Sequence, residues 1–264
     1  DLHEATRYVP KLLNQIGRPY TEKIAVIGAG PAGMSCAYYL ANKGYPVTVF
    51  DRNPVPGGML TLGIPSFRLE KDVVNAEIDV LKELGVEFRF GVEVGKNMTL
   101  DALRADGYKA IYLAVGASKG TPAGCPGDDL KGVFTGVEFL RAVNLGKRPA
   151  IGKQVAVIGG GHVGLEVAHF LCANNKVTIV EMADEIGASV YYITKFKLLP
   201  MLREAGVTFR TGQAIAAVDD GSIRLRDTHT GQCTELKAEA VVLAMGSRPD
   251  LAARAAFDRN FDHV

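Results

Sequence analysis

The sequence lacks several features that would point to particular classes of protein. Its formal net charge is only +1, so no excess of positive charge predicts binding to nucleic acid or to an anionic membrane. It has no apolar stretch long enough to span a bilayer, so we expect no membrane insertion. The first residue is not Met, and no signal peptide precedes the first predicted strand. We therefore expect a piece of a longer, cytoplasmic protein.

Cysteine is scarce and scattered along the chain. The four cysteines form no CxxC pair and are Cys36, Cys125, Cys172 and Cys233. Zinc sites, iron–sulfur sites and dithiol redox pairs all depend on closely spaced thiols, so we expect none of these sites, and no metal, within this chain. The simpler interpretation is that the cysteines are small buried side chains.

Glycine is abundant, with 30 residues among 264, and one group of glycines follows a predicted strand. The sequence GAGPAG, residues 28–33, lies between the apolar run Lys23 to Ile27 and a predicted helix from Pro31 to Lys43. A second predicted strand, Val47 to Phe50, then ends at Asp51. The order of elements predicts a βαβ unit.

The same pattern recurs 131 residues later (159 − 28 = 131). The sequence GGGHVG, residues 159–164, follows the predicted strand Gln154 to Ile158 and precedes a predicted helix from Val163 to Ala173. The strand Val177 to Val180 then ends at Glu181. Because the whole unit is repeated once, the sequence predicts two domains of one type and no solenoid.

The spacing within each turn has a physical reason. The first glycine permits the tight turn, the second lets the backbone approach a pyrophosphate, and the third lets the helix pack closely on the strand. Free N–H groups and the helix dipole then favour an anion at the helix N-terminus. Asp51 follows Gly28 by 23 residues and Glu181 follows Gly159 by 22, close to the offset expected for a ribose-binding acid. A single glycine-rich turn does not by itself indicate a ligand. Two complete patterns of strand, turn, helix and acid favour two dinucleotide sites.

Several further motifs resemble one known family, the flavoproteins with two dinucleotide-binding domains. The group most like this chain contains the small subunit of glutamate synthase and the amino-terminal half of dihydropyrimidine dehydrogenase. The resemblance covers about residues 21–250 and rests on GGML (57–60), GIPSFRL (63–69), DVVNAEIDVLKEL (72–84), YKAIYLAVGA (108–117), GLEVA (164–168) and VVLAMGSRP (241–249).

The resemblance implies an α/β fold with two Rossmann-like three-layer domains, the NAD(P) domain inserted into the FAD domain. We expect a helical linker at residues 1–20, a first part of the FAD domain at 21–148, an NAD(P) domain at 149–245 and a return to the FAD domain at 246–264. Members of the family end their FAD domain with a strand and a Gly-Asp pair. This chain stops 19 residues after Met245 without such a pair, so we expect either that the return is truncated or that another segment completes the site.

The resemblance also implies which residues contact the cofactors. The FAD pyrophosphate is expected at Gly28, Gly30, Pro31, Ala32 and Gly33. The adenosine ribose is expected at Asp51 and the adenine near Val94. The flavin end is expected along Gly57, Gly58, Met59, Leu60 and Arg68, and Arg52 and Gly116 are further expected FAD contacts. For the nicotinamide dinucleotide, the expected residues are Gly159, Gly161, His162, Val163, Gly164 and Glu181.

We expect no catalytic side chain, because a hydride passes from nicotinamide to flavin when the two cofactors are positioned together. His162 is accordingly interpreted as a backbone ligand in preference to a proton donor. Arg68 is either a flavin contact or an ordinary surface arginine. Tyr191 and Tyr192, which precede a predicted helix from Lys195 to Glu204, are interpreted as packing or lid residues.

These expectations predict a flavin-dependent oxidoreductase module that passes a hydride from NADH to FAD and electrons onward to an iron–sulfur or other partner subunit. A self-contained flavin reductase of a small acceptor and a non-catalytic nucleotide-binding module remain alternatives. NADH is preferred over NADPH in this interpretation because Glu181 is followed by Met182, Ala183, Asp184 and Glu185, which offer no cation for a 2′-phosphate. The alternative is that Glu181 turns to solvent and both nucleotides are accepted.

Overall fold

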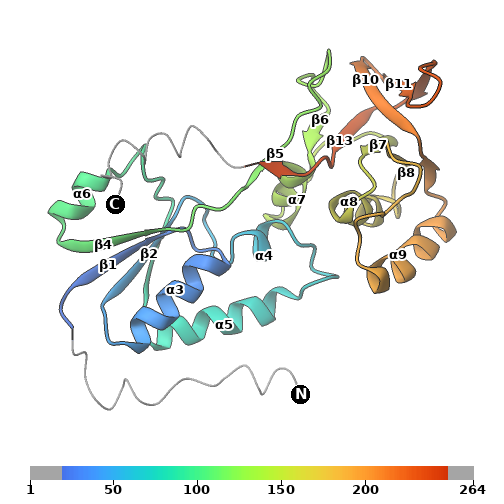
Figure 1. Ribbon diagram of the computed structural model, residues 1–264. Helices are drawn as coiled ribbons and strands as arrows, with labels where there is room; N and C mark the ends of the chain where they lie inside the picture. The colour runs from blue at the N-terminus through green and yellow to red at the C-terminus, as the bar shows by residue number, and fades with distance from the viewer. Residues whose placement is uncertain (1–19, 249–264) are drawn as a thin grey trace. The chain divides into compact units, whose positions relative to one another are not determined.

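The computed structural model describes residues 20–248 and divides them into two compact units, residues 20–117 (unit 1) and residues 118–248 (unit 2). Each unit is an α/β domain built on a parallel sheet, as the sequence predicted (Figure 1). The expected linker at residues 1–20 and most of the expected return at 246–264 lie outside the described residues. None of the helices within residues 20–248 combines the length and apolarity that crossing a membrane requires.

Unit 1 contains a four-stranded parallel sheet in the order β3-β2-β1-β4. Its strands are β1 (Lys23–Ile27), β2 (Val47–Asp51), β3 (Glu87–Phe90) and β4 (Tyr108–Leu113). Its helices are α3 (Pro31–Asn42), α4 (Met59–Leu62), α5 (Lys71–Glu83) and α6 (Leu100–Ala105).

The central strands of unit 1 are covered on both faces, which is why they are almost entirely apolar. All five residues of β2 are buried. On one face, α3 and α5 pack over the sheet, and α5 contributes Val80 and Leu81 to the core there. Val74, Ile78 and Leu81 are buried at helical spacing. On the other face, α6 begins at a capping residue, Thr99, whose hydroxyl accepts a hydrogen bond from the Ala102 N–H (3.0 Å).

Unit 2 contains a five-stranded parallel sheet in the order β6-β13-β7-β8-β9. Its strands are β6 (Val133–Thr135), β7 (Gln154–Ile158), β8 (Lys176–Val180), β9 (Thr208–Arg210) and β13 (Ala240–Leu243). Its helices are α7 (Gly136–Asn144), α8 (His162–Leu171) and α9 (Tyr192–Glu204). A separate antiparallel pair joins β5 (Lys119–Gly120) to β14 (Ser247–Arg248).

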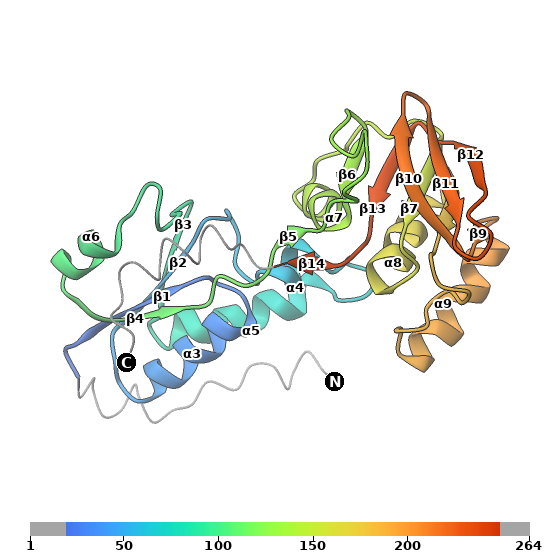
Figure 2. The same cartoon turned by 45° about the horizontal axis from the view of Figure 1, so that its top comes forward.

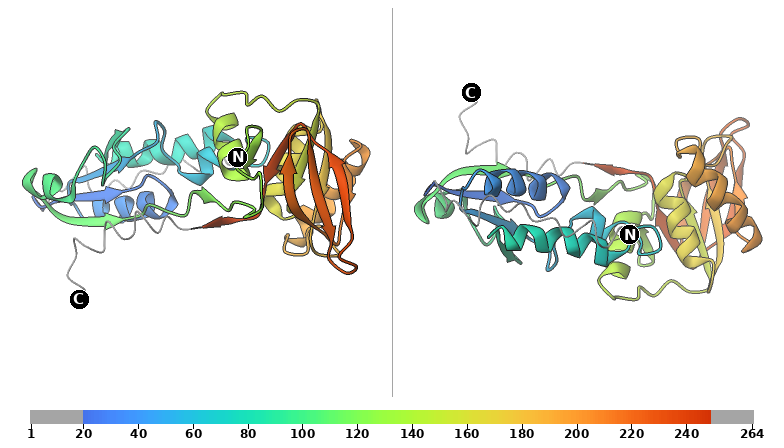
Figure 3. Two further views of the ribbon diagram at one scale, coloured as in Figure 1. Left: turned by 90° about the horizontal axis from the view of Figure 1, so that it is seen from above. Right: turned by 90° about the horizontal axis from the view of Figure 1, so that it is seen from below.

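A three-stranded antiparallel meander makes unit 2 three layers thick. It consists of β10 (Gln213–Asp219), β11 (Ser222–Asp227) and β12 (Cys233–Lys237). Figure 2 labels the three strands of the meander. In Figure 3 the orange strands of the meander lie in front in the left view, and the yellow helix α8 lies in front in the right view. Ile223 and Leu225 of the meander are fully buried against Ile158 and Val180 of the sheet.

The segment from residue 118 to 148 differs from the prediction. It was assigned to the FAD domain, but in the structure it belongs to unit 2. The cause is pairing, because β6 satisfies its backbone groups along β13 and α7 packs against α8. Short, Pro- and Gly-rich flanks make such an edge strand look like a connection in the sequence. The meander was not predicted either.

Candidate functional site

The first glycine turn joins β1 to α3, and two of its three glycines are required by the protein itself. Gly28 has a φ of +113°, and a Cβ atom there would lie 2.2 Å from the carbonyl oxygen of Ala114. A Cβ on Gly33 would lie 1.8 Å from the carbonyl oxygen of Gly28. Gly30 is different, because the nearest atom to its Cβ position is the Gly58 Cα at 3.9 Å. The open space over Gly30 is where a backbone-bound ligand can approach.

The second glycine turn, between β7 and α8, repeats this geometry. Gly159 has a φ of +109°, and its Cβ position lies 2.5 Å from the carbonyl oxygen of Ala244. A Cβ on Gly164 would lie 1.8 Å from the carbonyl oxygen of Gly159. Gly161 again faces open space, bounded only by the Ser189 Oγ atom at 3.8 Å. The two turns therefore share one steric pattern.

Both helices begin at the second glycine of their turn. Gly30 and Gly161 are the N-cap residues of α3 and α8, and neither helix end has a side-chain cap. Pro31 occupies the first helical position of α3, where a missing N–H is harmless, and His162 occupies the first position of α8. The uncapped N–H groups and the positive end of each helix dipole favour a phosphate at these points.

The acid of unit 1, Asp51, is tied to the glycine turn. Its Oδ2 atom accepts a hydrogen bond from the Ala29 N–H (2.7 Å). Its Oδ1 atom accepts from the Asn53 N–H (2.7 Å) and from Asn53 Nδ2 (2.9 Å). A carboxylate offers about four lone-pair sites, so three are filled and about one remains for a ribose hydroxyl. The side chain is thus held rigidly beside the turn, with Asp51 only 8% exposed.

Glu181 makes the matching contacts in unit 2. Its Oε2 atom accepts from the Gly160 N–H (2.7 Å), and its Oε1 atom accepts from the Ala183 N–H (2.9 Å). By the same count, about two lone-pair sites remain, which suits both hydroxyls of a ribose. The expected alternative, in which Glu181 turns to solvent, differs from this geometry, because the carboxylate is held against the turn and is only half exposed.

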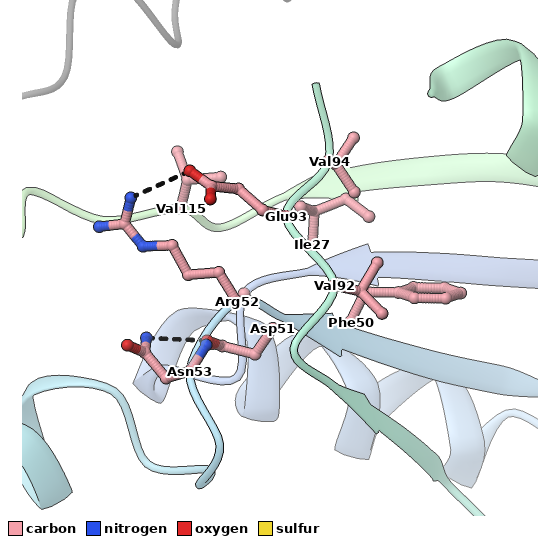
Figure 4. A pocket seen from close by; sticks show the side chains of 10 residues that line it. Ile27, Phe50, Asp51, Arg52, Asn53, Val92, Glu93, Val94 and Val115 are labelled. Carbon is pink, nitrogen blue, oxygen red and sulfur yellow. Dashed lines mark hydrogen bonds and ion pairs between the residues drawn. The ribbon is translucent and has the colours of Figure 1, made fainter. Parts of the chain in front are cut away.

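A cavity beside Asp51 brings together residues that the sequence assigned to the adenosine end (Figure 4). Asp51, Arg52 and Val94 all line it, and the Arg52 guanidinium extends toward the Glu93 carboxylate at 3.8 Å. Glu93 was not predicted, since nothing in its sequence context marks it. The remaining lining residues are Ile27, Gly28, Phe50, Asn53, Val92 and Val115.

The GGML segment packs directly on the first glycine turn. The Gly57 N–H donates to the carbonyl oxygen of Ala29 (2.8 Å). Gly58 has a φ of +53°, and a Cβ there would lie 2.7 Å from the Gly30 Cα. Met59 and Leu60 then begin the single turn of α4. This close approach explains why the segment contains two consecutive glycines.

Lys71 is a positioning residue that the sequence analysis missed. Its ammonium group donates to the carbonyl oxygen of Leu60 (2.9 Å) and also to that of Ile64, so it links the end of GGML to the beginning of GIPSFRL. Burial lowers the pKa of this amine. A lysine placed two residues after GIPSFRL is the only sequence signal that would have identified it.

Two expected contacts lie farther along the chain. Arg68 stands in a turn where its N–H donates to the carbonyl oxygen of Pro65 (2.9 Å), and its side chain is exposed. Gly116 follows β4 with a φ of +66° and is exposed. Tyr191 and Tyr192 are 67% and 73% exposed, so neither belongs to the core of unit 2, although the Tyr192 ring stacks on Phe196. Their interpretation as lid residues stays a prediction.

The cysteines behave as scattered single thiols. Cys36 and Cys172 pack against the cores of their units, whereas Cys233 is exposed. Burial raises the pKa of the Cys36 and Cys125 thiols, which disfavours the reactive thiolate at neutral pH. Within the described residues, no group of three or more His, Cys, Asp or Glu side chains is arranged to hold a metal ion.

Comparison with known proteins agrees with this geometry. The family described as pyridine nucleotide-disulphide oxidoreductase matches residues 22–260. The chain belongs to this family. Its relatives are FAD/NAD(P) oxidoreductases, so the resemblance inferred from the motifs is confirmed at the level of the family.

Three curated relatives illustrate the similarity. The chain is 47% identical over 150 residues to the NADP(+)-dependent formate dehydrogenase subunit beta of Moorella thermoacetica, covering 56% of this chain and 21% of that protein. It is 33% identical over 263 residues to the NAD-dependent dihydropyrimidine dehydrogenase subunit PreT of Escherichia coli O157:H7, covering 95% and 62%. It is 39% identical over 156 residues to the glutamate synthase [NADPH] small chain of Escherichia coli K12, covering 55% and 33%.

The chain spans less than two thirds of each of these relatives. Among solved structures, 2-naphthoyl-CoA reductase is similar in fold, with a TM-score of 0.78 at 24% identity, covering 91% of this chain and 35% of the other. The names of the curated relatives include both NAD- and NADP-dependent proteins, so membership of the family leaves the preferred nucleotide open.

Proposed function

We propose that this chain is the nucleotide-handling part of a flavoenzyme that passes a hydride from NADH to FAD. Unit 1 binds FAD and unit 2 binds the nicotinamide dinucleotide. The observation that carries the proposal is the repeated arrangement of turn and acid: Ala29 and Asp51 in unit 1, and Gly160 and Glu181 in unit 2, make equivalent hydrogen bonds.

The residues present fit two dinucleotides. In each turn the first and third glycines are needed by the fold, whereas the second faces a space that a Cβ atom would enter without meeting protein closer than 3.8 Å. A pyrophosphate in that space would accept hydrogen bonds from the helix N-terminus. Asp51 and Glu181 would then hold the ribose hydroxyls, as acids at this position do in dinucleotide-binding folds.

When both cofactors are bound, the nicotinamide supplies the hydride and the flavin ring accepts it. The residues of this chain contribute binding and orientation, through the two turns, the two acids and the GGML segment that Lys71 holds in place. Burial raises the pKa of the Cys36 and Cys125 thiols, and this disfavours their thiolates as members of a thiol relay.

The acceptor of the electrons is proposed to be an iron–sulfur partner subunit or domain. Two of the curated relatives are named as subunits and one as a small chain, and each is longer than the part that this chain matches. Rapid NADH oxidation by the full-length protein only after its partner is added is the expected result. Equally fast turnover with a small quinone alone would instead indicate a self-contained reductase. Nucleotide binding without flavin reduction would contradict the catalytic role.

The identity of the flavin is tested by denaturing the full-length protein and separating the released cofactor. We expect FAD, because FMN has no adenosine half to occupy the cavity beside Asp51 and Val94. Release of FMN alone would contradict the proposal. Asp51→Ala should weaken FAD binding by about 1.5–3 kcal/mol, the usual contribution of hydrogen bonds to a charged group.

The preference for NADH over NADPH rests on the charges around Glu181. A 2′-phosphate would meet the Glu181 carboxylate, and two anions would then lie in a partly desolvated site. Two basic side chains contact the acids that follow Glu181 in the sequence: His229 lies 2.6 Å from Asp184, and Lys195 forms an ion pair with Glu185. Arg210, which lies in register with Val180 on the neighbouring strand, was not expected from the sequence.

Steady-state kinetics of the full-length enzyme with each nucleotide tests this preference. We expect kcat/KM to favour NADH by roughly 30- to 150-fold, equivalent to about 2–3 kcal/mol. Glu181→Arg should raise NADPH use and lower NADH use. Glu204→Arg, at the end of α9, makes the same charge change away from the turn and should leave the ratio unchanged. Equal or better kcat/KM with NADPH would overturn the assignment.

A further inference from the structure

One hydroxyl group faces the space over the second glycine turn. Ser189 lies in the loop between β8 and α9, and its Oγ atom is 3.8 Å from the Cβ position of Gly161. Among the described residues outside the turn and its own helix, no other atom lies within 4 Å of that position. The Ser189 hydroxyl also has no hydrogen-bond partner among the described residues. We propose that Ser189 donates a hydrogen bond to the pyrophosphate of the nicotinamide dinucleotide.

The loop holds Ser189 in place through its neighbours. Ile186 and Val190 are buried in the core of unit 2 on either side of it. The Val190 N–H donates to the carbonyl oxygen of Gly187 (3.0 Å), which closes a turn around the serine. An ion pair between Glu185 and Lys195 links the start of the loop to α9. Because these contacts fix the backbone on both sides of Ser189, the hydroxyl needs little reorganisation to bind a ligand.

Unit 1 shows what the serine adds. There the matching position over Gly30 is bounded by the Gly58 Cα at 3.9 Å, which can neither donate nor accept a conventional hydrogen bond. The two pyrophosphate sites therefore have opposite chemistry on the wall that faces the turn. Unit 2 places a hydroxyl donor there, and unit 1 places a C–H group.

A hydroxyl at this point would add a side-chain donor to the backbone donors of the phosphate site. The N-terminus of α8 offers N–H groups without a side-chain cap, and the Ser189 hydroxyl lies beside the same turn. This role rests on the proposed binding of a dinucleotide by unit 2. It predicts that Ser189→Ala loses affinity for every ligand that contains a pyrophosphate, whether or not the ligand contains a nicotinamide.

Calorimetry on the full-length, FAD-loaded protein tests the role with three ligands: NAD⁺, ADP-ribose and adenosine. Ser189→Ala should lower the affinity for NAD⁺ and for ADP-ribose by about tenfold and leave the affinity for adenosine unchanged, because only the first two contain a pyrophosphate. Ser189→Thr keeps the hydroxyl and should restore most of the affinity. Ala188→Ser places a hydroxyl one residue away and should not rescue the Ser189→Ala variant.

The outcomes separate this role from the proposed function. If the wild-type protein binds neither NAD⁺ nor ADP-ribose, the proposed function fails and the role of Ser189 fails with it. If the wild type binds both and Ser189→Ala binds them equally well, only the role of Ser189 is overturned. An equal loss for adenosine and ADP-ribose, or a lower melting temperature of the variant, would assign Ser189 to loop structure and also overturn it.

Discussion

The two units form the same nucleotide turn from different residues. In unit 1 the carbonyl oxygen of Asp51 accepts from the Val92 N–H (3.0 Å), and in unit 2 that of Glu181 accepts from the Gln213 N–H (3.1 Å). Both acids also bind the N–H group that follows the first glycine of their turn. Side chains at the equivalent positions differ, whereas the backbone contacts are repeated. Backbone contacts therefore form the turn, and we expect the residues around it to decide which dinucleotide binds.

The surroundings differ in two ways. The GGML segment of unit 1 packs on its turn through glycine backbone, whereas the corresponding loop of unit 2 brings Ser189 to the turn. Beyond the acid, unit 1 has the Arg52–Glu93 pair. Unit 2 has the Asp184–His229 pair, in which Asp184 follows β8 and His229 lies in the β11–β12 connection. Each unit is therefore open to separate perturbation, which the following substitutions exploit.

Substituting the third glycine should have the largest effect. In Gly33→Ala and Gly164→Ala the new Cβ would lie 1.8 Å from the carbonyl oxygen of the first glycine, so backbone must move. We expect each unit to lose about 1–3 kcal/mol of stability, the usual cost of overpacking. Gly33→Ala should lose FAD, and Gly164→Ala should keep FAD but lose NADH binding. Thermal unfolding and flavin content measure this, and unchanged melting temperatures would contradict the steric argument.

Substituting the second glycine should separate binding from folding. In Gly30→Ala and Gly161→Ala the new methyl group meets no protein atom closer than 3.8 Å, so the melting temperature should stay unchanged. The methyl would occupy the space proposed for the pyrophosphate, and affinity should fall by about tenfold or more in the substituted unit alone. Calorimetry with FAD on the apoprotein and NAD⁺ on the FAD-loaded protein measures both effects. Unaltered affinity would contradict the proposal that the pyrophosphate binds at these turns.

Neutralising the two acids should destabilise unit 1 more than unit 2. Asp51→Asn affects three hydrogen bonds at a nearly buried carboxylate, and Glu181→Gln affects two at a half-buried one. We expect destabilisation of about 2 kcal/mol for the first and about 1 kcal/mol for the second. Chemical denaturation of the two variants gives both values. A larger loss of stability in Glu181→Gln than in Asp51→Asn would mean that burial of the carboxylate does not decide which variant is less stable.

The smallest expected effect is a pH dependence confined to unit 2. The hydrogen bond to Asp184 raises the pKa of the exposed His229. A raised pKa means that the pair contributes stability below the unfolded pKa of histidine and loses it as pH rises through the folded pKa. Asp227, on the same connection, also lies near His229, and the N–H groups of Thr230 and His229 lower the pKa of its carboxyl.

NMR titration of His229 measures this effect. Asp184→Asn should lower the pKa of His229 toward its ordinary value, and Glu185→Gln, one residue away, should not. An unchanged titration in Asp184→Asn would show that the pair does not form in solution.

Much of the arrangement could be predicted because it depends on local sequence. The strands Lys23–Ile27 and Gln154–Ile158 were predicted with the bounds that the structure gives them. Glycine spacing and the offset of each acid predicted the two turns, since these depend on steric limits within about two dozen residues. Lys71, Glu93 and Ser189 were not recognised, because their roles come from contacts with other segments.

The sequence by itself determined the parallel α/β class, the two turns and the family. The tertiary structure alone decided that residues 118–148 join unit 2, that Ser189 faces Gly161, and that His229 reaches Asp184. The physical reason is the range of the interactions. A turn is specified by the residues within it, whereas an edge strand, a loop wall or an ion pair across 45 residues depends on which surfaces folding brings together.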